Sequence, residues 1–225
     1  MDRYAVIHTV MPREFVLLQG QGCKWKQCTF CDYHTDVSED PFSVNREVLA
    51  CVTGIYGVLD VINSSLELDG QTIKDIKRIV KEKNIHTLWF EAHYMYRHKL
   101  EKFAEQFDGV DVKFRCGIES FDGALRELWK KGVSSDVTVE DVAKYFHGVC
   151  LLCCTEGDSK ERISRDIALA EQYFEYASVN VFCENTTHVK RDNNLTKWFL
   201  KEVYPELKQS KKIEILINNT DLGVG

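Results

Sequence analysis

The chain has 225 residues, of which 44% are hydrophobic and 28% are charged, and its formal net charge at pH 7 is −6. These fractions are ordinary for a soluble globular protein, and the length suits one substantial domain rather than two. No run approaches the roughly 20 apolar residues of a membrane helix, and the acidic balance disfavours a long nucleic-acid surface, which needs clustered Lys and Arg.

Apolar, strand-like runs alternate along the chain with amphipathic, helix-like stretches. Strands are predicted near residues 15–19, 58–63, 87–91, 112–118, 148–153, 178–183 and 213–218. Helices are predicted between them at 43–56, 72–83, 97–107, 123–131, 139–146, 160–174 and 195–207. This alternation predicts parallel strands joined by crossover helices.

The predicted strands are apolar at nearly every position, as buried parallel strands are. Only three prolines and no low-complexity segment interrupt the chain, so a single domain over residues 1–225 is expected. The unit is either an open doubly wound sheet or a partial barrel, and both bind ligands at the carboxyl ends of their strands.

The N-terminal sequence lacks a basic and then apolar signal region, so a cytoplasmic location is expected. Nine cysteines are an odd number and are not spaced like a disulfide framework. In a reducing compartment, closely spaced cysteines indicate a metal or catalytic site, and scattered ones indicate buried small residues.

Three cysteines, Cys23, Cys28 and Cys31, follow the first predicted strand with the spacing C-x4-C-x2-C. Close thiolates are soft ligands that suit an iron–sulfur cluster or zinc. A four-iron cluster held by three cysteines leaves one iron free for a small molecule, and the aromatic Phe30 beside Cys31 favours this interpretation. Zinc stays open because His34 completes a C-x4-C-x2-C-x2-H pattern, although structural zinc sites more often use paired arms in small domains.

Four further segments extend the pattern, and with them the chain resembles the radical S-adenosylmethionine (SAM) superfamily. Residues 63–69, 91–96, 117–120 and 130–132 resemble the T-S-G-S-F-L-D, E-S-R-P-E-Y, G-L-E-S and N-K-G segments of archaeosine-type and elongator-like members. The first stands where other members carry Gly-Gly-Glu. The cysteine motif departs from the usual C-x3-C-x2-C by one residue, so the resemblance rests on all the segments in order.

The resemblance implies an α/β fold, a radical SAM partial (βα)6 barrel with a mostly parallel sheet and an additional C-terminal strand. It implies a [4Fe-4S] cluster on the three cysteines, with the amino and carboxylate groups of S-adenosyl-L-methionine on the fourth iron. One electron, from a reductant such as flavodoxin or ferredoxin, cleaves SAM to methionine and a 5′-deoxyadenosyl radical. This radical takes a hydrogen atom from the substrate, while the protein positions the reactants and excludes water.

The resemblance also implies residues that contact SAM. Phe30 and Tyr33 are expected at the adenine, as are the strand residues Leu151 and Leu152. Short polar side chains at 63–65 are expected at the methionine amino group, and Glu119 and Ser120 at the ribose or amino end. The three residues at 63–65 are Asn63, Ser64 and Ser65. Each has a plainer interpretation, namely a strand-end turn, a solvated carboxylate or a core side chain.

Polar side chains at the other strand ends are expected to meet the substrate. They are Glu91, His93, Tyr94, Asn180, Glu184, Asn185 and Asp221. Glu91 and His93 are the candidates for a catalytic role, because a histidine exchanges protons near neutral pH; a capped loop histidine is the alternative. The tail 218–225 is expected either to close over the pocket or to be a disordered terminus.

The remaining cysteines suggest no second cluster. Cys150, Cys153 and Cys154 are awkwardly spaced for one metal, because adjacent strand side chains point to opposite faces. Buried strand cysteines are the favoured interpretation. The solitary Cys51, Cys116 and Cys183 are expected in the core.

This chain keeps the motif style of the archaeosine-type members on little more than the bare core, with an acidic balance, and in this combination it resembles the queuine lyases. Such an enzyme cleaves the C–N bond of free queuine and releases 7-aminomethyl-7-deazaguanine. A guanine-like edge needs a carboxylate acceptor, for which Glu91, Glu184 and Asp221 are candidates. Two alternatives stay open: a radical SAM enzyme that modifies a deazaguanine or other base in transfer RNA, and a non-catalytic, zinc-stabilised binding module.

Overall fold

The computed structural model describes residues 2–222, apart from the side chains of residues 63–65. One eight-stranded sheet runs in sequence order from β1 to β8. β1 (Tyr4–Ile7) is antiparallel to β2 (Arg13–Leu17), and every later pair of neighbours is parallel. The later strands are β3 (Val58–Ser64), β4 (Thr87–Ala92), β5 (Asp111–Glu119), β6 (Gly148–Cys153), β7 (Tyr176–Val181) and β8 (Ile213–Leu216).

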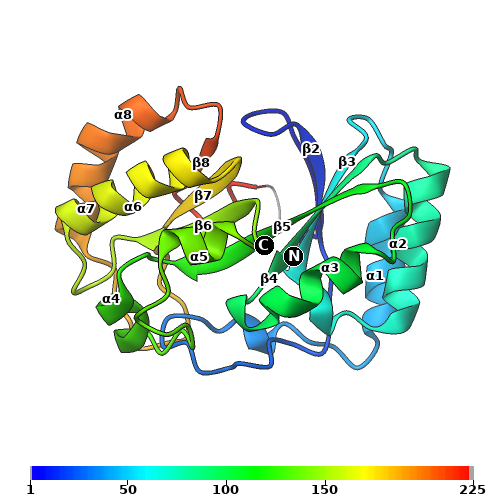
Figure 1. Ribbon diagram of the computed structural model, residues 1–225, viewed down its shortest axis with the longest axis horizontal. Coiled ribbons are helices and arrows are strands. Elements are labelled where there is room, and N and C mark those ends of the chain that lie inside the picture. Colours follow the sequence, from blue (N-terminus) through cyan, green and yellow to red (C-terminus); the bar gives the residue numbers. More distant parts are fainter. Residues whose placement is uncertain (1, 223–225) are drawn as a thin grey trace.

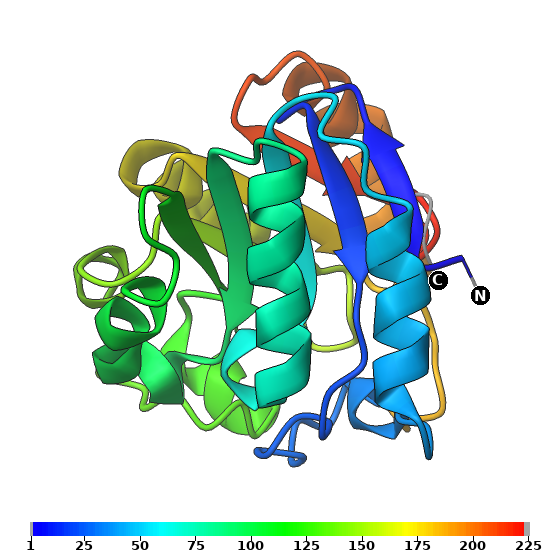
Figure 2. The same cartoon turned by 90° about the vertical axis from the view of Figure 1, so that its right-hand side faces the viewer.

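Helices connect the parallel strands and cover the outer side of the curled sheet (Figures 1 and 2). This one-sided arrangement follows because consecutive right-handed crossovers place their helices on the same face. The helices are α1 (Pro41–Ala50), α2 (Gly70–Glu82), α3 (Leu100–Ala104), α4 (Gly123–Leu128), α5 (Val139–Ala143), α6 (Lys160–Tyr173), α7 (Asn193–Trp198) and α8 (Tyr204–Leu207). In the described part of the chain, none of them has the length and apolar character to cross a membrane.

The predicted partial barrel is confirmed, since β2 to β7 form six βα units and β8 adds the extra strand. The four-residue β1 was not predicted, because it is too short for periodicity to reveal it. The predicted helix 195–207 is divided into α7, a π-helical turn (Phe199–Val203) and α8. Pro205 lies at the start of α8, where its missing N–H interrupts the regular hydrogen-bond pattern.

Strand side chains alternate between a helix-covered face and an inner face. Val61, Phe90, Cys116 and Leu151 belong to the main hydrophobic core beneath the helices. Their sequence neighbours therefore line the concave inner side. The six-unit core thus presents a surface on which residues from distant strands can meet.

A buried ionic network fills part of this inner face. Asp60 of β3 accepts hydrogen bonds from Arg13 Nε at 2.8 Å and from Arg115 Nη2 at 3.0 Å. Arg13 also binds Glu214 of β8 at 2.8 Å, and Tyr176 donates to the same carboxylate at 2.5 Å. These five residues, here called the floor network, join β2, β3, β5, β7 and β8. Because Arg13 and Glu214 connect strands near opposite edges of the sheet, the network supports its curvature.

We expect Asp60→Asn to lower the free energy of unfolding by about 3–5 kcal/mol, because two buried guanidinium groups lose their shared counter-ion. Burial would raise the pKa of Asp60, but Arg115 and Arg13 hold it below its usual value. The stabilisation is therefore present above pH about 4, where an unfolded aspartate is ionised, and is lost as the pH falls through the native pKa.

Urea unfolding near neutral pH and in acid would measure both effects. Glu82→Gln is the matched control, since Glu82 forms a half-exposed helix pair with Arg78 at 2.9 Å. Such a pair contributes at most about 0.5 kcal/mol. Equal losses in the two variants would contradict the role given to Asp60.

Candidate active site

The cysteine loop leaves the carboxyl end of β2 and runs along the lower edge of the molecule in Figure 1, next to α4. Cys28 and Cys31 are partly buried against an apolar group of five residues, here called the mouth cluster. Its members are Phe30, Leu125, Trp129, Leu152 and Phe182. The rings of Phe30 and Trp129 meet edge to face, with their centroids 5.5 Å apart. Both Phe30 and Leu152, predicted to contact adenine, therefore lie beside the cysteines.

Hydrogen bonds to two neighbouring segments hold the cysteine loop. Asn185 Nδ2 donates to the Phe30 carbonyl at 2.7 Å, and Thr186 donates to Asp32 at 2.7 Å. Trp25 Nε1 donates to the Lys130 carbonyl, also at 2.7 Å. The amide of Asn185, predicted to face the substrate, thus binds the cysteine loop instead. Sequence reasoning did not find these contacts, because they join residues more than a hundred positions apart.

The donor set fits an iron–sulfur cluster. Burial raises the pKa of Cys28 to about 11 and that of Cys31 to about 12, while the nearby Lys131 acts to lower both. Among the described residues, no three His, Cys, Asp or Glu side chains form a group that would hold a single metal ion. Each ligand of a four-iron cluster binds a different iron, so these sulfurs need not converge on one point. Three soft sulfurs on one loop match that requirement.

Three charged side chains gather around Gly117 near the end of β5. A Cβ atom at Gly117 would lie 3.1 Å from Glu119 Oε1, 3.5 Å from Lys131 Nζ and 3.7 Å from Glu91 Oε1. Glu119 has a φ of 66°, and the register of β5 against β6 shifts at this point. The left-handed backbone and the missing side chain of Gly117 together let the three charged groups approach one another.

Lys131 is a site residue to which the sequence assigned no role. Its ammonium binds Glu119 Oε1 at 3.0 Å and lies 5.7 Å from the centre of the Phe30 ring. The side chain is 9% exposed. Burial would lower the pKa of Lys131, but Glu119 and Cys28 raise it, so the group stays cationic. Lys131 therefore places a fixed positive charge between Glu119 and the cysteine loop. Its position in the Lys-Lys-Gly segment at 130–132 is the feature of the sequence that could have indicated a functional role.

Glu91, at the end of β4, presents a partly open carboxylate on the inner face. Its side chain is 36% exposed, and Oε2 lies 3.7 Å from both Arg115 Nε and Cys150 Sγ. Burial among protein groups and the negative charge of Glu119 raise the pKa of Glu91. Arg115 Nε has no hydrogen-bond partner within the part of the chain that the structure describes. Glu91 is thus held loosely and can accept hydrogen bonds from a ligand.

His93 is buried, and both of its ring nitrogens take part in hydrogen bonds. Its Nδ1 accepts a hydrogen bond from Met95 N at 3.1 Å, and Nε2 lies 2.8 Å from the Lys131 carbonyl, to which it donates as the neutral tautomer. The ring stacks on Trp25 with centroids 5.9 Å apart. Burial and the charge of Lys131 lower the pKa of His93 to about 4. Of the two interpretations that the sequence leaves open, the geometry matches the capped loop histidine rather than the proton-transfer role.

The low pKa of His93 predicts a pH-dependent loss of stability. As the pH falls from about 6.5 to about 4, the unfolded chain binds a proton at this ring before the folded chain does. Between pH 7 and pH 5 this should cost the wild type on the order of 2 kcal/mol. His93→Gln should lose that part of the pH dependence in urea unfolding, whereas a substitution of the exposed His98 should retain it. Parallel pH profiles in wild type and His93→Gln would contradict the assignment.

Two predicted site residues face away from the inner surface. Ser120 Oγ donates to Asp166 of α6 at 2.5 Å and accepts from Asp122 N at 3.0 Å, so its hydroxyl is engaged at the start of α4. Tyr94 belongs to the main core and stacks on Phe146. Neither is available to SAM or substrate in this arrangement.

The candidate carboxylates after β7 and β8 have local partners. Glu184 is 52% exposed and lies 3.5 Å from Lys190 Nζ. Asp221 accepts hydrogen bonds from Ile217 N at 2.6 Å and Asn218 N at 2.9 Å. Asp221 therefore stabilises the turn after β8. Leu222 packs against the Ile7, Phe15 and Leu17 cluster, and residues 223–225 of the predicted tail lie outside the described residues.

The face of the strand on which a residue lies decides whether the other predicted contacts are possible. Asn180 is paired with Leu152 on the neighbouring strand and shares its inner side. Leu151 packs beneath the helices, which excludes the predicted adenine contact because adjacent strand residues face opposite sides. Tyr33 is 63% exposed overall, and burial of its hydroxyl together with the negative charge of Glu91 raises its pKa to about 12. The side chains of Asn63, Ser64 and Ser65 lie outside the described part of the structure.

The other cysteines are mostly buried, as predicted for Cys116, Cys150, Cys153 and Cys154. Two details differ. Cys51 is exposed at the end of α1, and Cys153 and Cys154 both join the helix-side core, with their sulfurs 3.8 Å apart. Cys154 has a φ of 65°, so the chain has left the strand and the expected alternation no longer holds.

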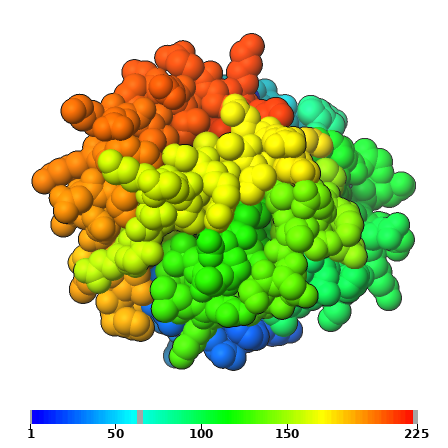
Figure 3. All heavy atoms as spheres, turned by 60° about the vertical axis from the view of Figure 1, so that its left-hand side comes forward, coloured from blue at the N-terminus to red at the C-terminus, as the bar shows by residue number. Residues whose placement is uncertain are grey.

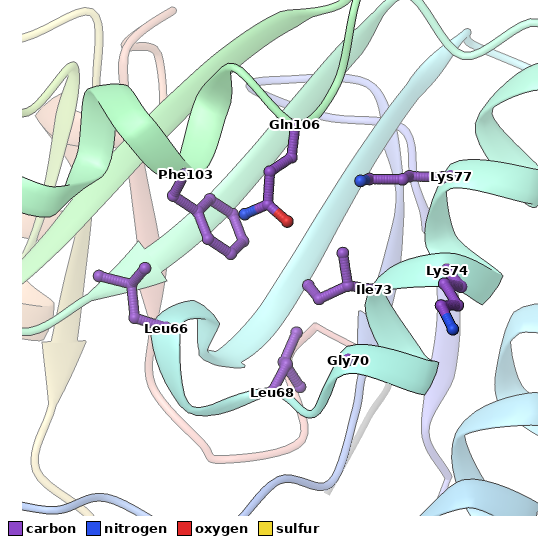
Figure 4. Close-up of a pocket in the computed structure, with 8 residues that line it drawn as sticks. All are labelled: Leu66, Leu68, Gly70, Ile73, Lys74, Lys77, Phe103 and Gln106. Atoms are coloured by element: carbon purple, nitrogen blue, oxygen red, sulfur yellow. The ribbon is translucent and has the colours of Figure 1, made fainter.

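A surface pocket of about 370 Å³ lies outside this site, between α2 and α3 (Figure 4). Leucine, isoleucine and phenylalanine side chains line it together with Lys74 and Lys77. None of the predicted ligands or inner-face residues contributes to it, so the candidate active site remains the inner face beneath the cysteine loop.

Comparisons with known proteins identify the family. No family model matches the sequence, and no curated protein matches it. Queuine lyase from Clostridium spiroforme, solved with bound SAM and queuine, matches with a TM-score of 0.94 and 38% identity over 100% of this chain and 99% of that chain. The chain belongs to the queuine lyase family of radical SAM enzymes. This membership overturns the non-catalytic zinc module.

A more distant likeness concerns the fold alone. Two structures of SuiB from Streptococcus suis, the second bound to S-adenosylmethionine, match with TM-scores of 0.57 and 0.58. Identity is 15% and 14%, and the match covers 92% of this chain and about half of SuiB. A protein of very different sequence therefore shares the fold of this chain.

Proposed function

We propose that this protein cleaves the C–N bond of free queuine and releases 7-aminomethyl-7-deazaguanine. The observation that carries the proposal is the full-length similarity to a queuine lyase that binds SAM and queuine. A [4Fe-4S] cluster on Cys23, Cys28 and Cys31 would supply the electron that converts SAM to methionine and a 5′-deoxyadenosyl radical. The remaining tasks of binding, orientation and water exclusion belong to side chains of this chain.

The mouth cluster supports an adenine subsite beside the cysteines. Phe30 and Leu152 offer apolar surface, and the exposed Tyr33 follows two residues after Cys31. Glu119 is proposed to bind the ribose hydroxyls or the amino group of SAM, with Lys131 fixing its carboxylate at 3.0 Å. Residues 63–65 lie at the carboxyl end of β3, the strand next to β2, from which the cysteine loop leaves. This position supports a role for these polar residues at the methionine moiety of SAM.

Glu91 is proposed to recognise the deazaguanine. The N1–H and exocyclic amine of a guanine-like edge form two parallel donors, which a carboxylate accepts in bidentate fashion. Glu184 is exposed beside Lys190, and Asp221 is used by its own turn. Of the three carboxylates, Glu91 is the one that combines an inner-face position with an approach open to a ligand. Asn180 of β7 lies on the same inner face.

The alternative substrate class, a base within transfer RNA, is tested by substrate size. Anaerobically reconstituted protein should release 5′-deoxyadenosine from SAM faster when free queuine is added and show no such response to transfer RNA. Stimulation by transfer RNA without stimulation by queuine would contradict the lyase proposal and favour a transfer-RNA modifier.

A further inference from the structure

Three exposed lysines surround Trp25 on the surface of the cysteine loop. Lys24 and Lys26 lie between the proposed ligands Cys23 and Cys28, and Lys130 follows α4. Figure 3 shows the blue, N-terminal part of the chain at the lower edge of the molecule, directly beneath the green part that contains α4. Lys24, Trp25, Lys26 and Lys130 are here called the lysine patch.

Trp25 fixes the two segments of the patch together. Its indole N–H donates to the Lys130 carbonyl at 2.7 Å, and its ring lies so close to Gly132 that a Cβ there would be 2.4 Å away. The indole of Trp25 also stacks on the ring of His93, which further restricts its position. The three lysines therefore belong to one surface whose backbone is held in place.

The Glu67 carboxylate accepts a hydrogen bond from the backbone N–H of Lys24 at 2.9 Å, but the lysine side chains of the patch have no carboxylate partner in the described part of the chain. No ion pair among the described residues includes Lys24, Lys26 or Lys130, although Lys113 and Lys144 elsewhere on the surface each pair with a carboxylate. The protein as a whole carries a net charge of −6. A local concentration of positive charge on an acidic protein attracts a negatively charged partner and speeds its association.

Exposed apolar side chains lie close to the lysines in sequence and structure. Leu128, two residues before Lys130, is 64% exposed, and Met95, two residues after His93, is 44% exposed. An apolar contact area with a charged margin is typical of a protein-docking surface, whereas phosphate binding alone does not need exposed Leu or Met. The chemistry thus favours an acidic protein over a nucleic acid.

We propose that the lysine patch docks an acidic one-electron carrier protein, of the flavin or iron–sulfur type, that reduces the enzyme. This inference rests on the proposed function, because only a radical SAM reaction needs an electron at the cysteine loop. The carrier loses one electron at each delivery, and the cofactor bound by the cysteines gains it. A carrier seated on Lys24 and Lys26 would contact the backbone between two proposed ligands, which is a short route for that electron.

The test uses the reconstituted full-length enzyme with a triple substitution, Lys24→Glu, Lys26→Glu and Lys130→Glu. A bacterial flavodoxin is the probe, and its affinity is measured by titration at low and high salt. We expect the variant to bind flavodoxin at least about tenfold more weakly and to lose the salt dependence that the wild type shows. Deoxyadenosine formation driven by limiting reduced flavodoxin should fall about tenfold, whereas formation driven by dithionite should be unchanged.

A second triple variant, Lys201→Glu, Lys208→Glu and Lys211→Glu, is the control, because it makes the same change in net charge at exposed positions near α8. It should bind flavodoxin like the wild type. Equal weakening in both variants, or no weakening in the first, would overturn the docking proposal. Weaker transfer-RNA binding with unchanged flavodoxin binding would also overturn it, whereas failure of the wild type with dithionite would overturn the proposed function itself.

Discussion

Cys28→Ala is expected to remove the brown iron–sulfur absorbance of the reconstituted protein and to reduce SAM cleavage to background. Cys28 is the middle of the three proposed ligands in the C-x4-C-x2-C loop, and its side chain lies partly buried against the mouth cluster. With only Cys23 and Cys31 left, a cluster would have two protein ligands and two exposed irons. Iron and sulfide content, the visible spectrum and 5′-deoxyadenosine formation measure the loss.

Cys51→Ala is the matched control for this experiment, because Cys51 is exposed at the end of α1 and has no part in the site. It should keep the colour and the activity of the wild type. Retention of a full iron–sulfur spectrum by Cys28→Ala would show that other residues hold the cluster, and the assignment of the three ligands would be wrong.

Glu91→Gln is expected to lower kcat/KM for queuine by on the order of 100-fold, equivalent to about 3 kcal/mol. The substitution replaces a two-oxygen acceptor by a group that presents one acceptor and one donor, so a guanine-like edge loses a charge-assisted hydrogen bond. Slow SAM cleavage in the absence of queuine should change little, since Glu119 and Lys131 are untouched. The two rates are measured on the same preparation.

The pH profile gives a second readout for Glu91. Burial raises the pKa of this carboxylate, and only the ionised form accepts two hydrogen bonds. The wild type should therefore lose kcat/KM as the pH falls through a value above the ordinary glutamate pKa of about 4.3. Glu91→Gln should lack this acidic limb, and Glu184→Gln should keep it. A wild-type profile in Glu91→Gln would assign base recognition to another residue.

The fold was largely predictable because buried parallel strands and amphipathic helices leave periodic patterns in the sequence. All seven strands from β2 to β8 were predicted, with shifts of a few residues at their ends. The four-residue β1 escaped because it depends on pairing with β2 rather than on a pattern of its own. Strand ends shift because hydrogen bonding with neighbouring strands, and not local propensity, decides where a strand stops.

The candidate site was predictable in position but less so in detail. Sequence places Glu91, His93 and Glu119 at strand ends, yet it does not say which polar atoms have partners within the fold. His93 binds a carbonyl 38 positions away and Ser120 binds a carboxylate 46 positions away. Lys131 was overlooked as a functional group for the same reason: its importance comes from Glu119 and Phe30, which only the folded chain brings to it.

Mass spectrometry of the products is the most direct test of the account. Reconstituted enzyme, SAM, a reductant and free queuine should yield 7-aminomethyl-7-deazaguanine, and omission of SAM or of the reductant should abolish it. A protein that carries its iron–sulfur cluster and cleaves SAM, yet leaves queuine intact, would contradict the proposed reaction.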